Sequence, residues 1–147
     1  MDPTYENKEY ILTSLIALRF NEPQRGDVIV FHAPDDPDKD FIKRIMAIPG
    51  DSIHVKEGSV YLNNKKLDET AYLDSNVGTH GGSFMKEGVP VTVPEGNYIV
   101  MGDNRPHSSD SRQWGFLPKE KIIGDSLFVY WPLDNARLIK NPFPNQK

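Results

Sequence analysis

Two basic residues, Lys43 and Arg44, stand inside an otherwise apolar run that extends from residue 41 to residue 48. Burying a lysine among apolar side chains disfavours its charged form and lowers its pKa. A lysine that is neutral near physiological pH is able to accept a proton as a general base. Lys43 is therefore a candidate for chemistry. The alternative is a lysine on a strand edge that faces solvent and hinders aggregation.

A second stretch of interest covers residues 102–115 and reads GDNRPHSSDSRQWG. It is too polar for a core element, and it is rich in groups that form hydrogen bonds in fixed directions. These groups include Asp103, Ser108, Asp110 and Arg112. The composition favours a structured functional segment over an ordinary connecting loop.

Composition excludes several other kinds of chemistry. The chain has no cysteine, which rules out disulfides, thiolate nucleophiles and cysteine-ligated zinc. Its four histidines lack ligand spacings such as His-x-x-x-His, so we expect no metal and no other cofactor. The net charge is −4 without a long run of one sign, and nucleic acid is not an expected partner. No stretch reaches the roughly 18 consecutive apolar residues of a membrane span.

The elements that must position the polar residues are short strands separated by turns. The 11 glycines and 12 prolines punctuate segments rich in Val, Ile, Tyr and Phe. We therefore expect a mostly β fold with little helix. A two-residue hairpin turn is expected at Asn63-Asn64, because Asn tolerates positive φ. Residues 79–83 are expected as a flexible polar tip, and residues 118–122 as one helical turn. The expected strands are residues 10–17, 28–31, 40–47, 52–62 with a turn at Gly58, 91–93, 97–101 and 125–131.

Four blocks of the sequence, taken in order, resemble the motifs of the type I signal peptidases, or bacterial leader peptidases. The blocks are residues 1–4 (MDPT), 25–31 (RGDVIVF), 43–51 from Lys-Arg to Pro-Gly-Asp, and 102–115. This resemblance implies a single catalytic domain with a signal-peptidase-like complex of antiparallel sheets or barrel. Its core would cover residues about 1–55 and 95–135, a small β-rich lobe about 56–94, and an extended tail 136–147.

The family consists of membrane-anchored serine endopeptidases that use a Ser/Lys dyad. By resemblance, Lys43 is the general base, which takes the serine proton during attack and then protonates the leaving amine. Ser108 corresponds to the hydroxyl that orients Lys43. Two ion pairs are implied to brace the site, and for the second pair the alternative is a surface pair that contributes about 0–1 kcal/mol. The implied pairs are Arg44 with Asp103 and Arg112 with Asp110.

The nucleophile itself falls outside the matched residues. The family pattern is Ser-x-Ser-Met-x-Pro-Thr, and residues 1–4 match its last four positions. The nucleophilic serine would directly precede Met1, and the serine that helps form the oxyanion hole would lie two residues before that. The resemblance therefore predicts a catalytic-domain fragment that lacks its membrane anchor and, as written, cannot perform acylation.

The resemblance also implies how a substrate binds. Signal peptides would lie extended and pair with the strand that holds Lys43, a form of β-augmentation. Shallow apolar pockets would select small residues at positions −1 and −3 by excluding bulk. The expected partners are signal peptides of secreted preproteins and, for the full-length protein, the membrane surface. The catalytic domain would lie on the extracytoplasmic face of the cell membrane, the fragment itself being soluble. The implied substrate-binding residues are Asp40, Phe41, Ile42, Met1 and Pro3.

Two alternatives remain at this level. A self-cleaving repressor-type peptidase shares the Ser/Lys dyad, but it would need a linked DNA-binding domain and an internal Ala-Gly cleavage site, and neither is present. A non-catalytic pseudo-peptidase that binds extended peptides is the other alternative. Retention of Lys43 and Ser108 argues against it.

Overall fold

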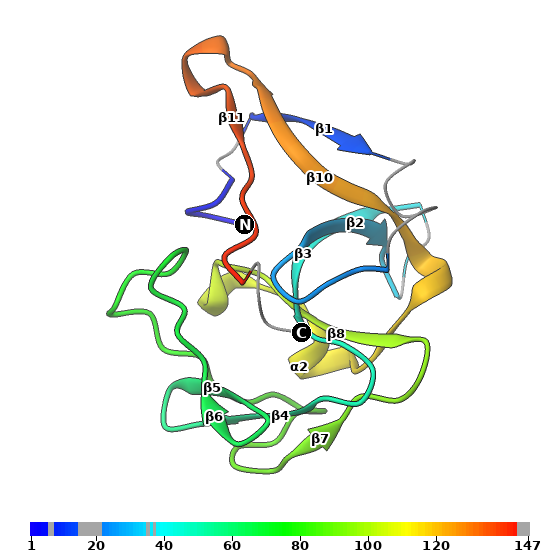
Figure 1. Cartoon of the computed structure of the whole chain (residues 1–147), viewed down its shortest axis with the longest axis vertical. Coiled ribbons are helices and arrows are strands. Elements are labelled where there is room, and N and C mark those ends of the chain that lie inside the picture. The colour runs from blue at the N-terminus through cyan, green and yellow to red at the C-terminus, as the bar shows by residue number, and fades with distance from the viewer. Residues whose placement is uncertain (6–7, 15–21, 35, 37, 144–147) are drawn as a thin grey trace.

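The computed structural model describes residues 1–5, 8–14, 22–34, 36 and 38–143. Antiparallel strands form almost all of its regular structure, and helices are limited to short turns, so the expected mostly β fold is confirmed. Residues 15–17 of the expected first strand lie outside the described residues. Figure 1 shows a larger sheet that curls into a half-barrel, with a small sheet below it.

The larger sheet carries the residues expected to do chemistry. It has seven strands, and β3 matches the expected strand 40–47 residue for residue. The strand expected at 125–131 begins three residues earlier, at Ile122, and it is followed by one more short strand. The strand order is β1 (Tyr10–Ser14), β10 (Ile122–Trp131), β2 (Val28–His32), β3 (Asp40–Ala47), β8 (Asn97–Met101) and β9 (Leu117–Pro118), with β11 (Arg137–Leu138) also paired to β10.

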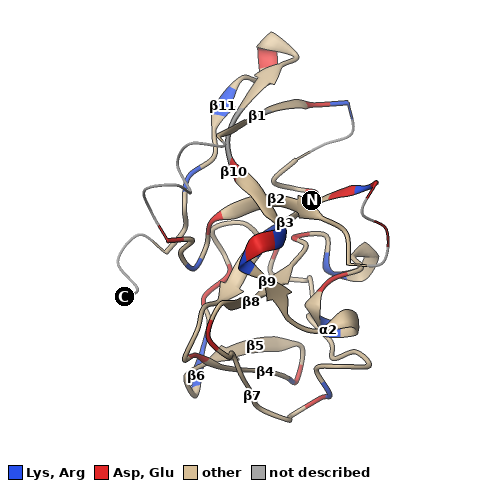
Figure 2. Ribbon diagram, turned by 90° about the vertical axis from the view of Figure 1, so that its right-hand side faces the viewer, with Lys and Arg blue, Asp and Glu red and all other residues tan. Residues whose placement is uncertain are grey.

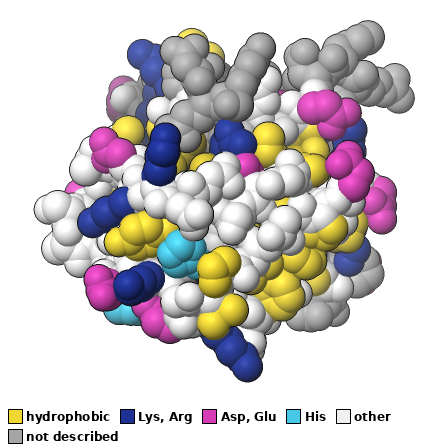
Figure 3. Space-filling model, turned by 60° about the horizontal axis from the view of Figure 1, so that its bottom comes forward, with side chains coloured by type: hydrophobic (Ala, Val, Ile, Leu, Met, Phe, Trp, Pro, Cys, Tyr) yellow, Lys and Arg dark blue, Asp and Glu magenta, His cyan; other side chains and the backbone are white. Residues whose placement is uncertain are grey.

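The smaller sheet has four strands and occupies the lower end of the molecule in Figure 1. Its hairpins follow the turn residues of the sequence. Asn63 and Asn64 both have positive φ, at 50° and 65°, as a two-residue hairpin turn requires. On the face shown in Figure 3, apolar side chains gather between scattered charged groups. The strand order is β6 (Lys65–Lys66), β5 (Ser59–Leu62), β4 (Ser52–Lys56) and β7 (Val91–Thr92).

The helical segments among the described residues are all short. The turn expected at residues 118–122 is the 3₁₀ turn η2 (Lys119–Lys121). The polar stretch 102–115 contains two turns that were not expected from the sequence, η1 (Arg105–His107) and α2 (Ser111–Trp114). Another 3₁₀ turn, η3 (Leu133–Asn135), precedes β11. Basic and acidic residues are interspersed along the ribbon in Figure 2. Within the described residues, no helix has the length and apolar character needed to cross the bilayer.

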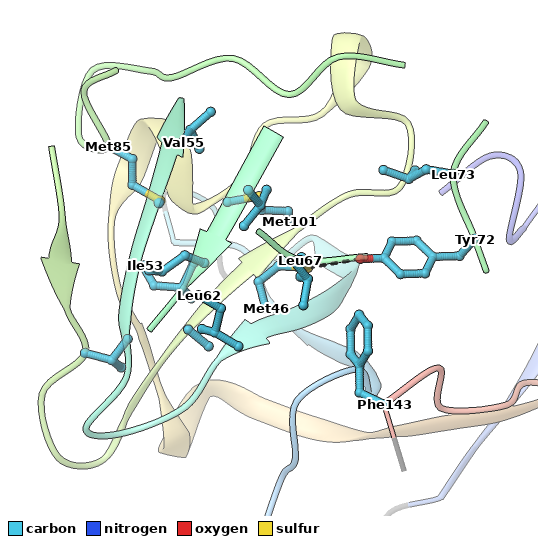
Figure 4. Close-up of a cluster of buried hydrophobic side chains, with 14 residues drawn as sticks. Met46, Ile53, Val55, Leu62, Leu67, Tyr72, Leu73, Met85, Met101 and Phe143 are labelled. Atoms are coloured by element: carbon cyan, nitrogen blue, oxygen red, sulfur yellow. Dashed lines mark hydrogen bonds between the residues drawn. The ribbon is translucent and has the colours of Figure 1, made fainter. Parts of the chain in front are cut away.

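The largest buried cluster joins the two sheets. Met46 and Met101 come from the larger sheet, and Ile53, Val55 and Val60 from the smaller one. Figure 4 shows these groups converging with side chains from the connecting segments. Phe143, near the end of the described chain, is only 8% exposed and packs into the same cluster. The segment after β11 therefore returns to the core.

Candidate active site

Strand β3 sorts its side chains onto two faces. Because side chains alternate along a strand, Lys43 points to the face opposite that of Arg44. Strand β2 pairs with β3 from Asp40 to Arg44, whereas β8 joins it only from Arg44 onward, opposite Met101. The edge from residue 40 to residue 43 is therefore free of β8.

Lys43 lies in the partly buried setting that the sequence predicts. Its Nζ is 5.3 Å from the centroid of the Phe41 ring. Burial lowers the pKa of Lys43 below its ordinary value, and the Arg112 charge acts in the same direction. The carboxylates of Asp110 and Asp103 oppose this shift. Burial dominates, so proton release from Lys43 is favoured relative to a lysine in water.

Ser108 is brought to Lys43 by the absence of a side chain at Gly102. A Cβ added at Gly102 would lie 2.2 Å from Ser108 Oγ and 3.5 Å from Lys43 Cδ. The Gly102 N–H donates to Ser108 Oγ at 3.2 Å and to Asp110 Oδ2 at 3.1 Å. Lys43 and Ser108 therefore contact the same small space, which a larger residue would fill.

The Arg44–Asp103 pair has the geometry that the sequence predicts. Both residues are 1% exposed. Arg44 donates from Nε to Asp103 Oδ1 at 3.0 Å and from Nη2 to Oδ2 at 2.8 Å. The Thr4 hydroxyl donates to the same carboxylate, and Arg44 Nη1 donates to the Gly26 carbonyl at 2.8 Å. This two-point pair ties β3 to the start of the polar stretch 102–115.

The Asp110–Arg112 pair is buried, so the alternative of a weak surface pair is wrong. The side chains are 0% and 6% exposed. Arg112 donates from Nε and Nη2 to the two oxygens of Asp110, at 2.8 and 2.9 Å. Burial alone would raise the pKa of Asp110, but its bonds to Arg112, Ser108 and the Gly102 N–H place it below the ordinary value. Asp110 also caps α2 in a capping box with Gln113.

The amino end of the chain lies beside the lysine. Burial lowers the pKa of the Met1 amine, and the charge of Lys43 lowers it further. Met1 Sδ accepts from the Asp103 N–H at 3.3 Å. Pro3 is exposed and lines a hollow of about 260 Å³ together with Thr4 and other residues.

Not all of the expected substrate-binding residues come together. Met1 and Phe41 lie close to Lys43. Ile42 is partly buried and packs with Met1 and Tyr5 in a small apolar cluster. Asp40 is exposed at the start of β3, where its carboxylate contacts His32 at 3.0 Å. Of these residues, Met1 and Phe41 lie near the lysine, and Ile42 adjoins Met1 in the small cluster.

Sequence reasoning missed two arginines that the structure places in the supports of the site. Arg25 makes a two-point ion pair with Asp51, with both contacts at 2.6 Å, and so links the block 25–31 to the Pro-Gly-Asp turn. Arg105 is 2% exposed and pairs with Glu69. Thr79, expected at a flexible polar tip, is 1% exposed and bonds to Arg105. In the sequence, the only indication of a role for Arg105 was its place in the Gly-Asp-Asn-Arg part of residues 102–115.

Comparisons with known proteins agree with this architecture. The family model for signal peptidase, peptidase S26, matches residues 1–131. A probable signal peptidase I-2 of Synechocystis sp. is 37% identical over 145 residues, which cover 95% of this chain and 62% of that protein. Signal peptidase IB of Staphylococcus aureus is 33% identical over 153 residues, covering 97% of this chain and 78% of that protein.

A solved structure supports the same relationship. The crystal structure of a signal peptidase I from Enterococcus faecalis matches with a TM-score of 0.59 at 30% identity, covering 71% of this chain and 97% of that chain. The chain therefore belongs to the signal peptidase family, peptidase S26. It spans less than two thirds of the length of the Synechocystis relative, 62%.

Proposed function

We propose that this chain forms the catalytic domain of a signal peptidase I, a serine endopeptidase that removes signal peptides from exported preproteins. The observation that carries the proposal is the setting of Lys43. Its side chain is partly buried, its pKa is lowered by that burial, and it shares the space at Gly102 with Ser108. Family membership supports the same reaction class. The proposed place of action is the extracytoplasmic face of the cell membrane.

In the proposed dyad the nucleophile is a serine joined to the amino side of Met1. The Met1 amine is close enough to Lys43 for the lysine charge to lower its pKa. A serine that precedes Met1 would be bonded directly to this nitrogen, and it would therefore begin close to Lys43.

The proposed reaction uses the lysine twice. Neutral Lys43 accepts the serine proton while the serine oxygen bonds to the scissile carbonyl carbon. The C–N bond then breaks, and the lysine ammonium passes its proton to the leaving amine. A water molecule hydrolyses the resulting ester by the same proton path. Ser108 restricts the rotamers of Lys43, which reduces the entropy lost on reaching the reactive geometry.

The free edge of β3 provides the proposed substrate groove. An extended peptide adds to an unpaired strand edge through backbone hydrogen bonds. The edge at residues 40–43 is free of β8, and Ile42 adjoins the apolar cluster that includes Met1. Small side chains at −1 and −3 would fit shallow apolar surface of this kind, whereas larger ones would be excluded.

The proposal is tested with the chain extended by Ser-x-Ser ahead of Met1. A signal-peptide substrate with Ala at −1 and −3 should be cleaved after the −1 residue. Lys43→Ala should reduce turnover by about 10²–10⁴-fold, the usual contribution of a general base. Lys119→Ala is the control, because Lys119 forms an exposed pair with Glu22. Turnover that survives Lys43→Ala would contradict the dyad.

A further inference from the structure

The arginine of the Gly-Asp-Asn-Arg sequence, Arg105, is held by the segment that connects β6 to β7. Arg105 is 2% exposed, and a buried guanidinium requires acceptors for its donors. Its Nε donates to the Gly102 carbonyl at 3.0 Å, and Nη1 donates to Thr79. Its Nη2 donates to Glu69 Oε1 at 2.5 Å, which makes Glu69 its ion-pair partner.

Through these bonds Arg105 fixes the loop that carries Ser108. Arg105 holds Gly102 at its carbonyl oxygen, and the N–H on the other side of the Gly102 Cα donates to Ser108 Oγ. The Arg105 carbonyl in turn accepts from Arg112 Nη2 at 2.8 Å. A shift of the Arg105 side chain would therefore move the peptide that positions Ser108 next to Lys43.

Glu69 is itself held in place by a neighbouring tyrosine. The Tyr72 hydroxyl donates to Glu69 Oε1 at 2.8 Å, and burial raises the pKa of Tyr72, so that the donor proton is retained. The Tyr72 ring lies 4.2 Å from the guanidinium carbon of Arg44 and packs edge-on against Phe143. Figure 4 shows the Tyr72 hydroxyl pointing toward Met46, with the Phe143 ring close by. Residues 69–72 thus contact both Arg44 and Arg105.

We propose that Glu69 is a positioning residue of the active site, which acts through Arg105 to hold the Gly102–Ser108 loop against Lys43. This inference rests on the proposed function for its effect on cleavage, but its structural part does not need activity. Without the Glu69 carboxylate, Arg105 becomes a buried cation without its ion-pair partner, and it then leaves its site or draws in water. The Gly102 peptide loses its support in either case.

Hydrogen exchange on the 147-residue chain tests the structural part. Glu69→Ala should raise the exchange rate of the Gly102 amide about tenfold or more relative to amides of β5. The reason is that the Gly102–Ser108 loop should open more often once Arg105 no longer holds it. Glu69→Gln retains an acceptor for Arg105 and Tyr72, so its exchange rate should fall between those of the wild type and Glu69→Ala. Val60→Ala is the control. Val60 is 0% exposed in β5, so truncating its side chain should destabilise the same region without removing a partner of Arg105.

Kinetics on the serine-extended chain tests the effect on the reaction. Glu69→Ala should lower kcat by about 10²-fold, the effect of a small misplacement of reacting groups, with KM changed less than about twofold. Val60→Ala should leave both constants near the wild-type values. Gly102 exchange no faster in Glu69→Ala than in Val60→Ala, after correction for global stability, would overturn the inference. Failure of every serine-extended chain to cleave would instead refute the proposed function, while the exchange result still decides the role of Glu69.

Discussion

Arg44 and Asp103, which are 59 positions apart in sequence, form a two-point ion pair with side-chain exposures of 2% and 0%. The residue before Arg44 is Lys43, and the residue before Asp103 is Gly102, which contacts Ser108. The pair therefore fixes the distance between the strand that carries the lysine and the loop that carries the serine hydroxyl. A buried pair of this kind is costly to break from one side, since the remaining charge has no partner.

Asp103→Asn should therefore destabilise the chain strongly. The expected loss in the free energy of unfolding is about 3–5 kcal/mol, because Arg44 stays charged and buried. Chemical denaturation with a fluorescence readout measures it. Glu22→Gln, which breaks the exposed pair with Lys119, serves as the control with an expected loss of about 0–1 kcal/mol. Equal losses in the two variants would contradict the bracing role of Asp103.

Gly102→Ala tests the close approach of Lys43 and Ser108. The added methyl group would lie 2.2 Å from Ser108 Oγ, so one of the two must move. Overpacking of this kind usually costs about 1–3 kcal/mol of stability. The double variant Gly102→Ala with Ser108→Gly removes the clashing atoms and should recover most of that stability, though not activity. No recovery in the double variant would show that the cost arises elsewhere.

Ile42→Ala tests the proposed substrate groove. Ile42 lies on the part of β3 that β8 leaves free, in a cluster with Met1. A smaller side chain should deepen the pocket, so the serine-extended enzyme should accept Val or Leu at −1 about 10-fold better relative to Ala. The ratio of kcat/KM values across a −1 series measures this preference. An unchanged ratio would remove Ile42 from the specificity pocket.

Asp125 makes stability depend on pH. Burial, and then the charge of Asp27, raises the pKa of Asp125 to about 6, and its Oδ1 is buried without a hydrogen-bond partner among the described residues. The folded state thus binds this proton more tightly than the unfolded state, and stability falls as pH rises from about 4 through 6. Asp125→Asn should add about 1–2 kcal/mol at pH 8, after discounting for partial solvent exposure, and almost nothing at pH 4. Thermal unfolding at both pH values checks this, and an equal gain at both would contradict it.

The sequence predicted the parts of the fold that local patterns control. The apolar run of β3 and the turn at Asn63-Asn64 depend on neighbours within a few residues, and both appear as expected. The resemblance in the block 102–115 also placed Asp103 and Asp110 opposite their arginines. The motif alone was enough to predict these pairs, because the resemblance assigns a particular arginine as the partner of each aspartate.

Other features required the tertiary structure. Glu69 lies 36 positions from Arg105, in a stretch without a strand pattern, and no local rule pairs them. Phe143 was expected in an extended tail, yet it packs on Tyr72 in the central cluster. The two turns at Arg105–His107 and Ser111–Trp114 are too short to produce a helical period in the sequence. Contacts between distant segments decide the first two cases.

The pKa of Lys43 decides whether this lysine is suited to act as the general base, and it is measured on the 147-residue chain. Lysine labelled with ¹³C and ¹⁵N is titrated by NMR, and the Lys43 signal is assigned by its loss in Lys43→Ala. Lys43 is expected to titrate below the ordinary lysine value of about 10.4, since burial disfavours its ammonium form. A Lys43 that titrates at or above that value would contradict its role as the general base.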